Sequence, residues 1–173
     1  MQIPDLIVEK LPLLKKWIED TLIQYAPEAM SLADLKFPRL PSYCSEDLLK
    51  SAKVVIVDKL PMPPLSSWGL IAFKHFENEP FIALSYEDII FSRKQEAENE
   101  PSFFHELVHL LQWRRLGAEG FLYYYVKGLL EAMYYTSPLE VMAFELQDEF
   151  ENNPTPFDLE KRVDEELEES LKS

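Results

Sequence analysis

The most constraining feature of this sequence is the run His105-Glu106-Leu107-Val108-His109, which matches the pattern H-E-x-x-H. In an α-helix, residues four positions apart lie about 40° apart on one face, so both imidazoles can reach one metal ion. Buried imidazoles need polar partners, and a metal ion supplies them. We therefore predict one Zn²⁺ per chain, bound through His105 and His109; the alternative is an ordinary helix that contains these letters by chance. Burial is expected because mostly apolar residues surround the histidines: Phe103, Phe104, Leu107, Val108, Leu110 and Leu111.

Glu106 occupies the acidic position of the motif and projects about 100° from His105 around the helix axis. A carboxylate placed there can hold the water that zinc activates without itself binding the ion. It can then take the water's proton as the water attacks a carbonyl carbon. We predict that Glu106 is the catalytic base and is not a metal ligand.

A zinc site of this kind needs a third protein ligand. The metzincin extension of the motif would place glycine at position 112 and histidine at 115, but the chain has Gln112 and Arg115. His75, the only other histidine, precedes the expected hairpin and is interpreted as a surface or packing residue.

Glu140 is the preferred third ligand because it borders the apolar face of a later helix, as in His₂Glu sites. Its alternative role is local: Ser137-x-x-Glu140 is also a capping box, in which the glutamate bonds back to the first turn of its own helix. If Glu140 is only a cap, Glu131, Glu145 and His75 are the next candidates. The apolar face is set by Leu139, Met142, Ala143 and Leu146.

Composition limits the class of protein. The 173 residues suffice for one domain, and a formal net charge of −14 repels phosphate backbones, so no nucleic-acid partner is expected. One cysteine, Cys44, and an acidic start without a signal-peptide pattern are typical of a cytoplasmic protein. The longest apolar stretch, residues 120–135, is interrupted by Lys127 and Glu131. No transmembrane segment is predicted, and a buried helix is favoured there over peripheral membrane contact.

The pattern of the chain predicts a single α+β domain over residues 1–173, with a small, mostly antiparallel sheet packed on helices. Its N-terminal part (1–52) is expected to be helical, with a helix over 6–25 that Pro12 splits or kinks and one or two turns over 45–52. Its middle part (53–92) is expected to be strand-rich, with strands near 54–57, 70–73, 81–84 and 89–91, the last two forming a hairpin. Its last part (99–172) is expected to be helical and to carry the metal site, with helices starting after residues 99, 120, 137 and 155.

The stretch from Phe103 to Glu145 resembles the gluzincin-type zinc metallopeptidases. It is most similar to small bacterial proteins of uncharacterised function that carry H-E-L-V-H-x-x-Q, a G-F-L-x-x-Y helix and P-L-E, as this chain does. The resemblance covers about half the chain and implies a zincin-like fold. It implies that His105, His109 and Glu140 bind zinc, that Glu106 is the general base, and that an edge strand within 81–91 binds an extended peptide. The E-x-x-x-D motif of the thermolysin-like members is absent, because Phe144 stands where the aspartate would be.

We therefore expect a zinc hydrolase that acts on a peptide or protein substrate. Such an enzyme also needs a group that stabilises the oxyanion. Five tyrosines follow the motif and are candidates for this role, but each is also suited to a core position. None is assigned. The alternative is a catalytically silent scaffold that docks a protein partner or a membrane surface through residues 121–135. The five tyrosines that follow the motif are Tyr123, Tyr124, Tyr125, Tyr134 and Tyr135.

Overall fold

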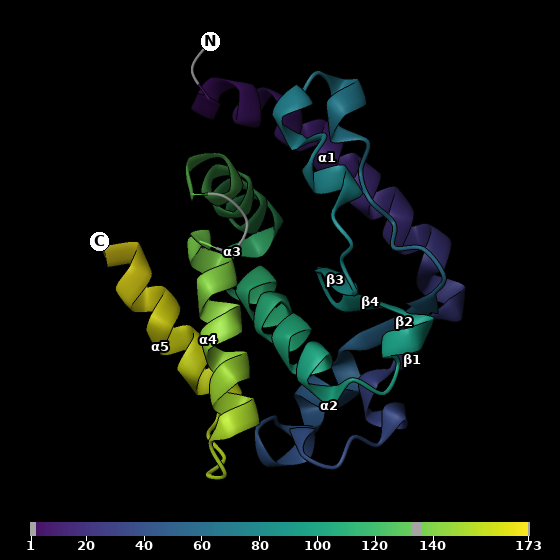
Figure 1. The fold of residues 1–173 in the computed structure, drawn as a ribbon, viewed down its shortest axis with the longest axis vertical. Coiled ribbons are helices and arrows are strands. Elements are labelled where there is room, and N and C mark those ends of the chain that lie inside the picture. The colour runs from purple at the N-terminus through teal and green to yellow at the C-terminus, as the bar shows by residue number, and fades with distance from the viewer. Residues whose placement is uncertain (1–2, 133–135, 173) are drawn as a thin grey trace.

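The computed structural model describes residues 3–132 and 136–172, and within them the chain forms an α+β fold of helices around a small mixed sheet (Figure 1). Along the sequence, one long helix and one short helix precede the main strands of the sheet, and three helices follow them. Tyr134 and Tyr135 lie outside the described residues. The elements are α1 (Ile3–Tyr25), β1 (Met30–Ser31), α2 (Glu46–Ser51), β2 (Lys53–Val57), β3 (Ala83–Tyr86), β4 (Ile89–Arg93), α3 (Glu100–Ala132), α4 (Pro138–Asn152) and α5 (Leu159–Lys172).

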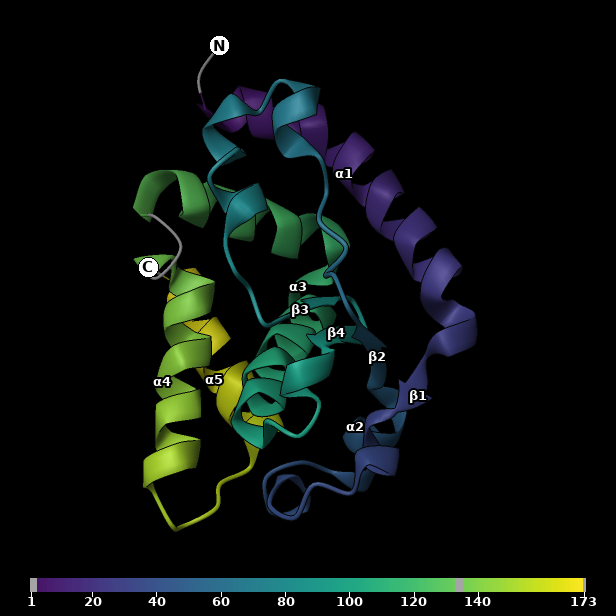
Figure 2. The same cartoon turned by 45° about the vertical axis from the view of Figure 1, so that its right-hand side comes forward.

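The sheet has the order β1-β2-β4-β3. β1 pairs with β2 and β3 pairs with β4 in antiparallel fashion, whereas the central pair, β2 and β4, is parallel. The predicted hairpin is confirmed: β3 and β4 are joined by a two-residue turn in which Glu87 has a φ of 50°. The N-terminal part is not purely helical, since β1 supplies one edge of the sheet. The other edge is β3, which packs against α3 (Figure 2).

The helix α3 carries the motif and lies between the sheet and α4 (Figures 1 and 2). Its start is capped by Asn99, whose Oδ1 accepts a hydrogen bond from Ser102 N at 3.2 Å. A break inside the helix falls at Gly117 and not at the predicted Gly120, because Gly117 adopts φ 69° and ψ 165°, a conformation that glycine tolerates and other residues rarely reach. The part after Gly117 can therefore return aromatic side chains toward the motif.

The predicted start of α4 is confirmed, whereas α5 starts at Leu159 and not directly after residue 155. Both helices pack on α3. Phe104 of α3 stacks on Phe150 of α4, with ring centroids 4.3 Å apart. Both rings are fully buried, so each contributes about 2–3 kcal/mol of hydrophobic stabilisation. This contact holds α4, and hence Glu140, at a fixed height along α3.

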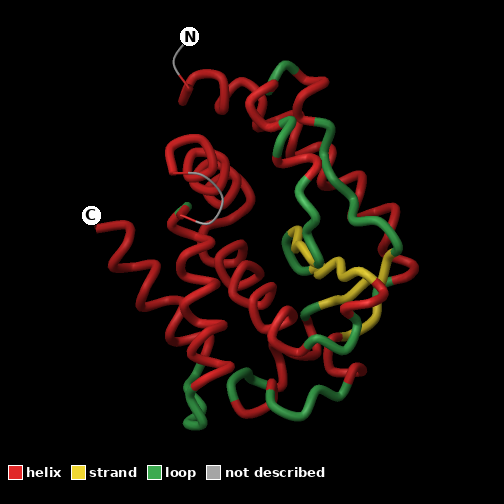
Figure 3. Tube along the Cα trace, viewed as in Figure 1, coloured by secondary structure: helices red, strands yellow, loops and turns green. Residues whose placement is uncertain are grey.

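The segment between β2 and β3 contains short 3₁₀ turns and loops (Figure 3). The strand expected near residues 70–73 is wrong: Ile71–Phe73 is a 3₁₀ turn, in which Phe73 is buried and Ile71 is exposed. Two hydrogen bonds fix the segment: Tyr86 Oη donates to Pro61 O at 2.8 Å, and Ser66 Oγ donates to Glu77 Oε2 at 2.8 Å. The predicted split of the N-terminal helix at Pro12 is wrong, because α1 continues through Pro12 as one helix.

Among the described residues, no helix is both long and apolar enough to cross a membrane. Within residues 121–130, the side chains differ in burial. Phe121, Leu122 and Val126 turn inward and are buried, while Tyr124 is 42% exposed. Tyr123 and Tyr125 are half-buried, so the aromatic side chains of this segment range from buried to exposed.

Candidate metal centre

His105, His109 and Glu140 come together in the core, and their donor atoms could hold a metal ion. The two Nε2 atoms lie 3.1 Å apart, and each lies 3.4 Å from Glu140 Oε2. The histidines are 6% and 5% exposed and the glutamate 1%. The helical spacing predicted from the sequence places both imidazoles on one face of α3, and α4 brings the carboxylate to them.

The size of this triangle can be compared with the one that zinc requires. With metal–ligand distances of roughly 2.0–2.1 Å, two ligands of a tetrahedral zinc ion are about 3.3 Å apart. The observed separations of 3.1, 3.4 and 3.4 Å lie close to this value. The donor set of two imidazoles and one carboxylate is also one that zinc prefers, and three ligands leave a fourth position free.

Two glutamines orient the imidazoles. Gln147 Oε1 lies 3.1 Å from His105 Nδ1, and Gln112 Oε1 lies 2.8 Å from His109 Nδ1. The amide nitrogen of Gln147 donates to Glu151 Oε1, and that of Gln112 donates to Leu139 O, so the amide oxygens must face the histidines. Each Nδ1 therefore carries a proton and donates it, which leaves the Nε2 lone pairs for a metal ion.

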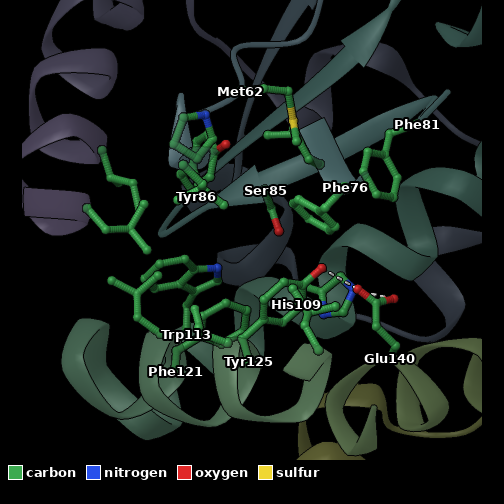
Figure 4. Close-up of a pocket in the computed structure, with 18 of the residues that line it drawn as sticks. Met62, Phe76, Phe81, Ser85, Tyr86, His109, Trp113, Phe121, Tyr125 and Glu140 are labelled. Atoms are coloured by element: carbon green, nitrogen blue, oxygen red, sulfur yellow. Dashed lines mark hydrogen bonds and ion pairs between the residues drawn. The ribbon is translucent and has the colours of Figure 1, made fainter. Parts of the chain in front are cut away.

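A tyrosine fixes the third candidate ligand. Tyr125 Oη donates to Glu140 Oε1 at 2.6 Å, while Glu140 Oε2 has no hydrogen-bond partner among the described residues and faces the histidines. The capping-box interpretation of Glu140 is not realised, because Ser137 makes no side-chain cap bond and its Oγ has no hydrogen-bond partner within the described part of the chain. Glu140 thus points across to α3 and not back to its own helix (Figure 4).

The charges of the site are strongly coupled. Burial by itself lowers the pKa of His109, but Glu140, Glu106 and Gln112 outweigh burial and raise that pKa to about 9. For Glu140, burial opposes ionisation, yet the two histidines lower its pKa well below the usual range. With a pKa of about 9, the imidazole of His109 is charged at neutral pH.

Glu106 lies beside the triangle and lines the same cavity as His109 and Glu140. It is 6% exposed, and its Oε2 has no hydrogen-bond partner among the described residues. Burial raises its pKa, while the two histidines and the nearby hydroxyl of Ser85 on β3 favour the charged form. A carboxylate with a raised pKa is a stronger base, and its free oxygen is available to a water or a substrate.

The cavity beside the centre has a volume of about 90 Å³. Its walls come from α1, from the segment between β2 and β3, from β3 and from both parts of α3 (Figure 4). Leu14 and Ile18 place α1 directly over the site. The N-terminal helix and the segment before β3 therefore cover the candidate centre.

The remaining sequence candidates lie elsewhere. The side chain of His75 is 87% exposed and forms an ion pair with Glu79 at 2.7 Å. Glu145 is exposed on α4, and Arg115 pairs with Asp164 on α5 at 3.4 Å. The side chain of Glu131 is outside the described part of the chain.

Several residues of the site were not assigned from the sequence. Gln112, used above only to exclude the metzincin pattern, lies three residues after His109, so its place on the same helical face was a usable signal. Tyr125 and Gln147 gave no such signal, because their positions depend on the break at Gly117 and on the packing of α4. Ser85 reaches the site only because β3 packs on α3.

The centre was also compared with known proteins. No protein-family model, no curated protein and no solved structure matches this chain. The geometry of His105, His109 and Glu140 is therefore the support for a metal centre in this protein.

Proposed function

We propose that the protein is a zinc-dependent hydrolase that cleaves a peptide or amide bond, as a zincin-like metallopeptidase does. One observation carries this proposal: a triangle of buried zinc-type donors lies beside a buried carboxylate, Glu106, that has a free oxygen facing the same cavity. A purely structural metal site would be closed by a fourth protein ligand. Among the described residues, no fourth His, Cys, Asp or Glu joins the group of His105, His109 and Glu140.

The roles of the residues follow from their positions. His105, His109 and Glu140 would hold the ion, with Gln147, Gln112 and Tyr125 orienting them. Bound zinc polarises a carbonyl and lowers the pKa of a coordinated water toward about 7.

Glu106 takes a proton from the attacking water as the water oxygen bonds to the carbonyl carbon. It then delivers that proton to the leaving nitrogen as the C–N bond breaks. The apolar walls around Glu106 exclude bulk water and keep its pKa raised.

The test compares the zinc-reconstituted parent with Glu106→Gln, using a library of quenched fluorescent peptides. The substitution preserves size and removes the base, so we expect bound zinc to remain at one per chain while hydrolysis falls by about a hundredfold or more. Glu119→Gln is the matched control, since Glu119 lies on the same helix with its side chain 82% exposed. Hydrolysis by Glu106→Gln at the parental rate would overturn the general-base role. A zinc-loaded parent that cleaves no peptide would favour the silent scaffold instead.

A further inference from the structure

The cavity beside the candidate centre gathers buried polar atoms that lack partners. Among the described residues, six buried side-chain atoms have no hydrogen-bond partner, and four of these belong to residues that line this one cavity. Three of the four are explained by the proposed function: Glu140 Oε2 faces the histidines, Glu106 Oε2 is the free oxygen of the base, and Ser85 Oγ lies near Glu106. Trp113 Nε1 has no such explanation.

Trp113 is held rigidly in the wall of the cavity. It lies four residues after His109 on the same face of α3, and its ring stacks on Phe121 with centroids 4.0 Å apart and planes 18° apart. The residue is 4% exposed. Figure 4 shows the indole ring at the cavity, with its nitrogen directed into the open space below Ser85.

An indole N–H can only donate a hydrogen bond. Buried donors without an acceptor are rare in folded proteins, and each one calls for a specific reason. Packing does not supply that reason, because a phenylalanine could also stack on Phe121. An acceptor atom that enters the cavity with a ligand can supply the missing partner.

The rest of the cavity defines the chemistry of that ligand. Leu14, Ile18, Phe76, Leu122 and Val126 make its walls mainly apolar. Its volume of about 90 Å³ is smaller than the roughly 150 Å³ of a cavity known to bind benzene, so it has room for a few carbon atoms and not for an aromatic ring.

Two carboxylates, Glu106 and Glu140, line the cavity near the metal position. They disfavour an anionic ligand as long as no metal is bound. An uncharged amide suits both polar groups of the cavity wall, because its oxygen can accept a hydrogen bond from Trp113 and its N–H can donate one to Glu106.

We propose that Trp113 is a substrate-binding residue. Its indole N–H donates a hydrogen bond to an amide carbonyl of the substrate. An aliphatic side chain of the same substrate, three or four carbons in size, fills the cavity. This rests on the proposed function in so far as it names the substrate class. The binding step itself requires neither bound zinc nor turnover.

The test uses the full chain labelled with ¹⁵N, both zinc-loaded and chelator-treated, and follows its three indole N–H signals by NMR. Isobutyramide is the probe, and benzamide is the matched probe with an aromatic ring. The Trp113 signal, assigned by its loss in Trp113→Phe, should move downfield and saturate with isobutyramide in both forms of the protein. The signals of Trp17 and Trp68 should stay in place, and benzamide should produce no saturable shift.

A second measurement follows the methyl protons of isobutyramide by saturation transfer. Trp113→Phe keeps the ring stacked on Phe121 but removes the donor, so the dissociation constant should rise about tenfold, as expected for the loss of one hydrogen bond. Trp17→Phe, which lies outside the cavity lining, should bind as the parent does.

Three results would overturn the proposal: a Trp113 signal that isobutyramide does not move, an equal shift with benzamide, or unchanged affinity in Trp113→Phe. If that variant does not fold, Trp17→Phe and Trp68→Phe identify the other two indole signals, and the shift of the remaining parental signal, that of Trp113, decides. Saturable isobutyramide binding by a chain that hydrolyses no peptide would reject the proposed enzyme and keep this ligand site. Hydrolysis of a peptide with no movement of the Trp113 signal would reject this ligand site and keep the proposed enzyme.

Discussion

Tyr125 and Glu140 are joined by a 2.6 Å hydrogen bond that connects the second part of α3 to the start of α4. The bond occupies Glu140 Oε1 and leaves Oε2 facing the two histidines, 3.4 Å from each Nε2. Because Tyr125 also stacks on Phe121, with centroids 5.3 Å apart, its hydroxyl is held in place by packing. The rotamer of the candidate ligand is therefore set by a residue from another helix.

We predict that Tyr125→Phe weakens zinc binding by about tenfold or more, the usual cost of losing a residue that orients a ligand. The ring stays in place on Phe121, so the metal-free protein should keep its fold. Tyr124→Phe is the matched control, since Tyr124 is the exposed neighbour on the same helix. Zinc affinity is measured by competition with a chromophoric chelator. Equal affinities in the two variants would show that the hydroxyl does not position Glu140.

Glu140→Gln should also lower zinc affinity by tenfold or more, because a neutral amide is a much poorer ligand than a carboxylate. The capping-box interpretation predicts no change, since glutamine serves in that motif almost as well as glutamate. Glu145→Gln, on the exposed side of the same helix, is the control and should bind zinc as the parent does. Parental affinity in Glu140→Gln would remove Glu140 from the ligand set.

His105→Ala or His109→Ala should abolish stoichiometric zinc binding, which elemental analysis of reconstituted protein measures directly. The parent should hold one zinc per chain. His75→Ala should retain it, because the side chain of that histidine is 87% exposed and forms an ion pair with Glu79. A parent that takes up no zinc after reconstitution would contradict the metal centre as a whole.

Zinc binding at pH 7 should release about one proton from His109. The carboxylate of Glu140 helps to raise the pKa of His109 to about 9, so this imidazole is protonated in the metal-free protein at neutral pH. Zinc must displace that proton, and its affinity should therefore increase as the pH rises toward 9. Calorimetry in buffers of different ionisation enthalpy counts the protons. In Glu140→Gln the release should be smaller, because a main cause of the raised pKa is gone; an unchanged count would contradict this origin.

Gly128→Ala tests how closely the second part of α3 must approach α4. A Cβ at Gly128 would lie 2.9 Å from Ser137 Cβ and 3.3 Å from Pro138 Cδ, so the start of α4 would have to move. We expect a loss of about 1–3 kcal/mol in the free energy of unfolding, together with weaker zinc binding. Urea denaturation of the metal-free protein measures the first effect.

The matched substitution for that test is Gly120→Ala, whose Cβ would meet only Leu116 Cβ at 3.4 Å. It should be neutral or stabilise the protein by up to about 1 kcal/mol, because alanine is the better helix former. A Gly128→Ala variant as stable as Gly120→Ala would show that α4 can shift without cost.

Features that depend on near neighbours in the chain were predictable from the sequence. The i, i+4 spacing of His105 and His109, the cap at Asn99 and the β3–β4 hairpin are set within a few residues of themselves, so local geometry determines them. The apolar residues around the motif correctly indicated that its helix is buried.

What only the tertiary structure decided concerns contacts between distant segments. In sequence, the residues from Ser137 to Glu140 fit both a capping box and a ligand position. Tyr125 decides between these two roles by its hydrogen bond to Glu140. The break of α3 at Gly117 and the packing of Phe104 on Phe150 bring Tyr125 close to Glu140. The role of Trp113 was not predictable from the sequence either, since a tryptophan in an apolar helix is usually a core residue. Only the tertiary structure shows that its unpaired indole nitrogen lines a cavity. A local pattern fixes which face of a helix a side chain occupies, but what that face meets depends on long-range packing, and in this protein the packing assembled the centre.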